Sequence, residues 1–89
     1  MYEIIFTEKA SNFAKKLPKA NKRKLKEILE KLKENPFSYP YRKIKGESNL
    51  YRIRIGTYRI LYEVNEKEKK VTVLKIEKRS KAYRNLLMS

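Results

Sequence analysis

The sequence contains no cysteine, histidine, aspartate, glutamine or tryptophan. Without cysteine there is no disulfide framework, no thiolate nucleophile and no cysteine zinc site. Without histidine and aspartate, the common metal clusters, the Ser-His-Asp triad and a histidine-based ribonuclease are excluded. The longest apolar runs extend over a few residues, so we expect no segment that spans a membrane.

The first residues, 1–6, carry neither the basic start nor the long apolar run of a secretory signal peptide. We therefore expect a cytoplasmic protein. Glutamine is absent, whereas lysine (17 residues) and glutamate (10 residues) are abundant. That bias fits the protein of a thermophile.

The chain has 89 residues, which leaves room for one core, and we expect one domain over 1–89. Isoleucine, leucine, valine and phenylalanine supply 23 of these residues, enough to predict a folded chain. Twenty-four lysines and arginines stand against 10 acids, all glutamate, for a net charge of +14. This excess predicts a polyanionic partner: nucleic acid or an acidic protein first, an anionic membrane a distant third.

The first half of the chain predicts a short strand and two helices. Tyr2–Phe6 is apolar and β-prone, and the Thr7 hydroxyl can cap the helix that follows. Pro18 ends this helix, because the residue before a proline is pushed out of the helical region. A second helix is expected over 19–34, stopped by Asn35-Pro36. The apolar residues of the first helix recur at helical spacing; they are Ala10, Phe13, Ala14 and Leu17.

The second half of the chain has the period of two that is typical of strands. Strands are expected over 41–45, 51–55, 58–64 and 71–77. Gly56-Thr57 suits a two-residue type II′ hairpin, and Ser80 can cap a short C-terminal helix. The order β-α-α-β-β-β-β, followed by that helix, predicts an α+β fold. We expect an antiparallel sheet with the N-terminal helical hairpin packed on one face.

The predicted hairpin brings arginines together. Its two-residue turn sets Ile55 opposite Tyr58 and Arg54 opposite Arg59, and Arg52 lies on the same face as that arginine pair. Like charges so placed are destabilising, whereas a bound phosphate would turn the repulsion into bidentate contacts. The alternative is that these charges only form the wet face of a half-buried sheet. The use of arginine favours phosphate binding, because the chain has 7 arginines against 17 lysines and three of the 7 fall in this hairpin.

The segment Tyr51–Val64, followed by Val71–Ile76 and Lys78–Arg84, resembles the RelE toxins of the RelE/ParE toxin–antitoxin superfamily. The leading strand, the proline-broken helical hairpin and the Asn35-Pro36 stop also match, so the resemblance covers nearly the whole chain. It implies a ribosome-dependent ribonuclease that cuts messenger RNA in the decoding A site, without a metal or other cofactor. It also implies a RelB-like antitoxin that wraps and blocks the toxin, in a complex that we expect to be a heterotetramer.

The resemblance also implies roles for single residues. Arg59 matches the family's arginine on the central strand, Arg79 the arginine after the last strand, and Tyr83 the tyrosine of the C-terminal segment. Arg52 and Arg54 occupy two positions that are lysines in some members. Because arginine cannot be deprotonated in a protein, these two can act only electrostatically, and a general base is left to Tyr83, a lysine or ribosomal RNA. The candidate RNA contacts around these residues are Lys43, Lys45, Lys78, Lys81 and Arg84.

Two other functions stay open at the level of the sequence. A ParE-like relative would poison DNA gyrase by binding it, and a basic module could bind RNA or the ribosome without catalysis. The Tyr-Arg-(Ile/Leu)-(Leu/Val)-Tyr strand is less able to tell RelE from ParE than to indicate the superfamily. The presence of Arg59, Arg79 and Tyr83 together favours the ribonuclease.

Overall fold

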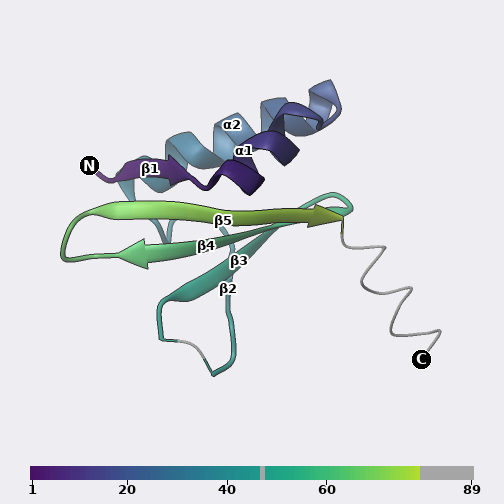
Figure 1. The fold of residues 1–89 in the computed structure, drawn as a ribbon. Helices are drawn as coiled ribbons and strands as arrows, with labels where there is room; N and C mark the ends of the chain where they lie inside the picture. Colours follow the sequence, from purple (N-terminus) through teal and green to yellow (C-terminus); the bar gives the residue numbers. More distant parts are fainter. Residues whose placement is uncertain (47, 79–89) are drawn as a thin grey trace.

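A computed structural model describes residues 1–46 and 48–78 of the chain (Figure 1). Its elements are β1 (Glu3–Phe6), α1 (Glu8–Lys15), α2 (Lys19–Glu34), β2 (Arg42–Lys43), β3 (Leu50–Ile55), β4 (Tyr58–Asn65) and β5 (Lys70–Lys78). The predicted α+β element order is confirmed over these residues. The helix expected from Ser80 onward lies outside the described residues.

The strands form one sheet in the order β1-β5-β4-β3-β2, and both helices lie on the same side of it (Figure 1). The pairs β2–β3, β3–β4 and β4–β5 are antiparallel, as predicted. The edge pair β1–β5 is parallel, so the expectation of an entirely antiparallel sheet is corrected. A tight turn makes the two strands that it joins antiparallel. α1 and α2 separate β1 from the other strands along the chain, so no tight turn fixes the direction of β1.

The helices begin and end where local chemistry requires. The Thr7 side chain accepts a hydrogen bond from the Ala10 N–H at 3.2 Å, which confirms the predicted cap of α1. Leu17 lies two residues beyond the end of α1, yet it is still buried in the core. Pro18 occupies the position before α2 without a side-chain capping hydrogen bond, and Asn35 ends the helix. Within the described residues, no helix is long and apolar enough to cross a membrane.

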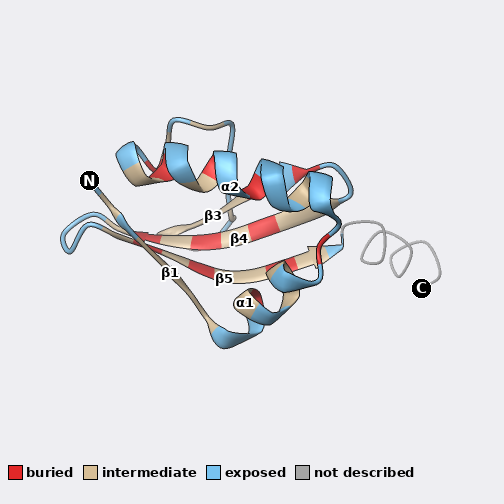
Figure 2. Ribbon diagram, turned by 90° about the horizontal axis from the view of Figure 1, so that it is seen from above, coloured by how far each residue is buried: buried red, intermediate tan, exposed pale blue. Residues whose placement is uncertain are grey.

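The core lies between the helices and the covered face of the sheet (Figure 2). Tyr62 is its largest fully buried side chain, and its hydroxyl donates to the Pro36 carbonyl at 3.3 Å. Burial raises the pKa of this phenol, and the neighbouring phenols of Tyr41 and Tyr51 add to the rise. The fully buried aliphatic residues that pack with it are Ile28, Leu32, Ile53, Ile60, Val71 and Val73.

A loop rich in aromatic residues joins α2 to β2. The rings of Phe37, Tyr41 and Tyr51 contact one another, with centroids 5.3–5.4 Å apart. β2 covers 42–43 rather than the expected 41–45. One further backbone bond, from the Ile44 N–H to the Leu50 carbonyl at 2.9 Å, follows β2, and the chain then turns at Gly46, where φ is +87°.

Two irregularities set which side chains reach the open face. Gly56 has φ +58° at the first turn position of the β3–β4 hairpin, as the predicted type II′ turn requires. In β5, Lys75 opposes Leu61 whereas Val73 opposes Tyr62, so one extra residue between them forms a β-bulge. The bulge changes the alternation of β5, so Lys75 and Glu77 point away from the helices.

Candidate functional site

The helices leave one face of the sheet uncovered (Figure 1), and the strand register places arginines of three neighbouring strands on that face. The register sets Arg42 opposite Arg52 across β2 and β3, and Arg54 opposite Arg59 across β3 and β4. The second pair, together with Ile55 opposite Tyr58, confirms the predicted hairpin register. The name arginine face is used below for the surface formed by Arg42, Arg52, Arg54, Arg59, Lys75 and Glu77.

Glu77 is an acid that contacts two cations of this face. The carboxylate oxygen Oε1 of Glu77 accepts a hydrogen bond from Nε of Arg59 at 2.5 Å, and it forms an ion pair with Nη2 of the same guanidinium at 2.5 Å. Its other oxygen, Oε2, lies 3.2 Å from Nζ of Lys75. Partial burial acts to raise the pKa of the Glu77 carboxyl, but the hydrogen bonds and charges of the two cations outweigh it and lower the pKa below its ordinary value.

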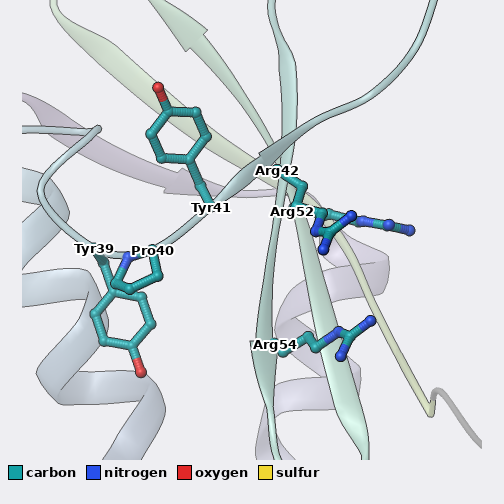
Figure 3. A pocket seen from close by; sticks show the side chains of 6 residues that line it. All are labelled: Tyr39, Pro40, Tyr41, Arg42, Arg52 and Arg54. Atoms are coloured by element: carbon teal, nitrogen blue, oxygen red, sulfur yellow. The ribbon is translucent and has the colours of Figure 1, made fainter.

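A shallow hollow of about 290 Å³ adjoins the arginine face (Figure 3). The Tyr39-Pro40-Tyr41 loop borders one side of it, and Figure 3 shows the side chains of Arg42, Arg52 and Arg54 fanning out from the other side. Tyr41 is 42% exposed. Clustered guanidinium groups form the kind of surface that binds phosphates.

The other predicted residues are placed less favourably or not described. Lys43 opposes Tyr51 and Lys78 opposes Tyr58, so the register directs both lysines to the face opposite the arginines, although both remain exposed. Lys45 is exposed in the turn at Gly46. The remaining predicted residues lie outside the described residues; they are Arg79, Lys81, Tyr83 and Arg84.

Comparisons with known proteins identify the family. A model described as the ParE toxin of type II toxin–antitoxin systems matches residues 4–83. The Methanocaldococcus jannaschii protein RelE1 is 38% identical over 74 residues, which cover 80% of this chain and 82% of that protein. This chain is a RelE-type member of the RelE/ParE family of type II toxins.

Solved structures give the same result for the fold of this RelE-type toxin. RelE in the RelE–RelB complex of Pyrococcus horikoshii is 31% identical, with a TM-score of 0.79, and the match covers 88% of this chain and 94% of that one. The isolated RelE toxin of E. coli is 27% identical, also with a TM-score of 0.79, over 99% and 97% of the two chains.

Three residues on the arginine face of this RelE-type toxin were missed from the sequence: Arg42, Lys75 and Glu77. Arg42 was missed because the long 44–49 connection does not fix the register of β2 as a two-residue turn would. Lys75 and Glu77 were missed because strict alternation from Val71 and Val73 assigns both to the covered face. Ile76 was the available signal: an apolar residue out of phase with the two valines, between charged neighbours, indicates a one-residue shift.

Proposed function

We propose that this RelE-type toxin is a ribosome-dependent endoribonuclease that cleaves messenger RNA in the A site. The observation that supports the proposal is the arginine face, in which Arg54 and Arg59 are directly opposed and Arg52 lies on the same face, on the uncovered side of the sheet. Guanidinium groups bind phosphates through paired hydrogen bonds and keep their charge at every working pH. Such a face suits a substrate whose phosphate gains negative charge as it reacts.

The proposed reaction uses a nucleophile supplied by the RNA itself. The ribose 2′-hydroxyl loses its proton and attacks the adjacent phosphorus, and the bond from phosphorus to the 5′ oxygen breaks. The leaving oxygen takes up a proton, so the products are a 2′,3′-cyclic phosphate and a 5′-hydroxyl. The arginines stabilise the charge that develops on the phosphate. We propose that no metal is needed, and within the described residues no cluster of three potential ligands gathers to hold one.

Proton transfer has to come from outside the arginines. A guanidinium cannot accept a proton, and the lowered pKa of Glu77 makes this carboxylate a weak base. We propose that Tyr83, a lysine such as Lys45, or ribosomal RNA moves the proton, and that Arg79 is a further phosphate contact. If ribosomal RNA moves the proton while the arginines stabilise the phosphate charge, cleavage depends on the ribosome.

We also propose that a RelB-like antitoxin neutralises the toxin, in a heterotetrameric complex. The relative from P. horikoshii was solved as a RelE–RelB complex. The net charge of +14 and the uncovered arginine face favour fast capture of an acidic segment. A disordered acidic chain that folds as it binds can cover a large part of such a surface.

Cell-free translation with the purified toxin tests the proposed activity. We expect new 5′-hydroxyl ends in messenger RNA at A-site codons, in the presence of ribosomes but not on naked RNA. Cleavage should persist in the presence of a chelator, at the lowest free magnesium concentration at which the ribosomes stay intact. A 3′-hydroxyl product would contradict the mechanism. The matching family model is described as ParE, so a DNA gyrase supercoiling assay runs in parallel; gyrase inhibition without RNA cleavage would establish the ParE-like alternative.

A further inference from the structure

Glu77 has a placement that the cleavage reaction does not by itself explain. An acid on a surface that binds phosphate weakens the attraction for RNA. Yet its carboxylate lies on the arginine face, with Oε1 on Arg59 and Oε2 on Lys75. Its side chain is 23% exposed and that of Arg59 is 26% exposed, so the pair is partly shielded from water.

Glu77 contacts one edge of the Arg59 guanidinium and leaves the other edge for a second ligand. Arginine has five N–H donors in a rigid planar fork. Glu77 takes the edge formed by Nε and Nη2. The end of the fork, formed by Nη1 and the second hydrogen of Nη2, points away from that contact and has the spacing that binds two phosphate oxygens.

We propose that Glu77 is a positioning residue, which fixes the plane of the Arg59 guanidinium so that the end of its fork meets the reacting phosphate. This inference rests on the proposed ribonuclease function. Lys75 contacts the other carboxylate oxygen, so each of the two oxygens of Glu77 is paired with a cation. An arginine oriented in advance loses less conformational entropy when the phosphate arrives.

A different role for Glu77, in which it competes with the phosphate for Arg59, predicts different effects of its removal on RNA binding and on the cleavage rate. If Glu77 merely occupied the place of the phosphate, its removal would strengthen RNA binding and speed cleavage. If it orients Arg59, its removal leaves binding unchanged or tighter while cleavage slows. The decisive measurement is therefore the single-turnover cleavage rate on messenger-programmed ribosomes, set against the affinity of the toxin for the same ribosomes.

The test compares wild-type toxin with Glu77→Ala and Glu77→Gln. Loss of a group that orients a metal ligand typically costs about 10- to 100-fold in activity, and by analogy we expect a cleavage rate about 10- to 100-fold lower in Glu77→Ala, without weaker ribosome binding. Glu77→Gln keeps an oxygen that can accept from Nε and Nη2, so it should recover most of the rate. Glu66→Ala, which removes an exposed acid in the 66–69 turn, is the control with the same change in charge.

A double-mutant comparison shows whether the effect passes through Arg59. In an Arg59→Ala background, adding Glu77→Ala should cause no further loss. The inference is overturned if Glu77→Ala cleaves as fast as wild type or faster, if its loss persists without Arg59, or if Glu66→Ala reproduces it. Thermal unfolding checks each variant, and Glu77→Met, of similar length, replaces the alanine variant if that one does not fold. A wild-type toxin without activity would instead refute the ribonuclease proposal and this inference with it.

Discussion

At the scale of single residues, the pairing of Arg59 with Glu77 alters the electrostatics of the arginine face. The sequence alone predicts repulsion between the opposed Arg54 and Arg59. The structure adds a carboxylate that contacts Arg59 and Lys75, which offsets part of this repulsion. Arg59 thus has an ion-pair partner within the protein, and part of the repulsion between the arginines is offset before any substrate binds.

Arg52 and Arg54 should each contribute to cleavage. Replacing either by alanine removes a fixed charge near the reacting phosphate, and we expect a rate loss of about 10²–10³-fold, the size seen when one transition-state donor is removed. Arg23→Ala, at an exposed position of α2, is the control for loss of one positive charge elsewhere. Single-turnover cleavage on programmed ribosomes measures the effect; equal losses in all three variants would show that only total charge matters.

The Glu77 pairing should make stability depend on pH in the acid range. The pKa of Glu77 is lowered in the folded state from its ordinary value of 4.5, so the unfolded chain binds the proton more readily. The contribution to stability is therefore full above about pH 4.5 and is lost as pH falls through the folded-state pKa. We expect wild type to exceed Glu77→Gln by up to about 1 kcal/mol at pH 7, because the pair is partly exposed.

Urea unfolding of both proteins at pH 7 and at pH 3 measures this difference. The difference in the free energy of unfolding should be smaller at the lower pH, because protonation of Glu77, which the unfolded chain favours, removes part of the contribution of the pair. A difference that is unchanged between the two pH values would mean that the charge of Glu77 makes no contribution to folding.

At the scale of elements, the arginine face depends on one turn and one bulge. The two-residue turn at Gly56 sets Arg54 against Arg59. The bulge in β5 then brings Glu77 opposite Arg59, so three neighbouring strands place their charged side chains in one row. β2 adds Arg42 beside Arg52, and both line the hollow next to the Tyr39-Pro40-Tyr41 loop.

Gly56 should be required for its backbone conformation rather than for lack of space. A Cβ at this position would meet only the Asn21 amide at 3.7 Å, an ordinary contact, but φ is +58°. Gly56→Ala should therefore lower the free energy of unfolding by about 1–2 kcal/mol, the cost of a left-handed residue with a Cβ. Gly56→Asn should cost less, since asparagine tolerates this region. Urea unfolding measures both; equal stability of wild type and the alanine variant would contradict the assigned turn.

The elements predicted from sequence are those set by local chemistry. Thr7, Pro18 and the Asn35-Pro36 stop place the helices, and the Gly56-Thr57 turn gives the Arg54–Arg59 pair, because each signal acts over a few residues. Features that depend on tertiary packing were not predicted: the parallel direction of β1, the partner of Arg42, and the bulge that turns Glu77 toward Arg59. The candidate site was therefore predicted as a set of cations, without the acid that one of them contacts.

At the scale of the whole molecule, both helices lie on one side of the sheet (Figure 1), and the register places the arginines on the other side. The core uses one side of the sheet, which leaves the other for contact with partners. Aliphatic side chains lie among the charges of that side, since Leu61 stands between Arg52 and Lys75 in the register. Such a surface can bind the phosphates of RNA, and it can also bind an acidic chain that carries apolar residues.

The antitoxin should therefore bind the arginine face directly. An acidic RelB-like segment, added to the toxin, should slow amide hydrogen exchange in residues 51–62, because this stretch forms β3, its turn and most of β4. Because the segment binds only the folded toxin, the melting temperature should also rise with antitoxin concentration. High salt is the control, since it screens the attraction of an exposed basic surface for an acidic chain and should slow association. Bound antitoxin that leaves exchange in 51–62 unchanged would place the interface elsewhere, and the arginine face would then not be the surface through which the toxin is neutralised.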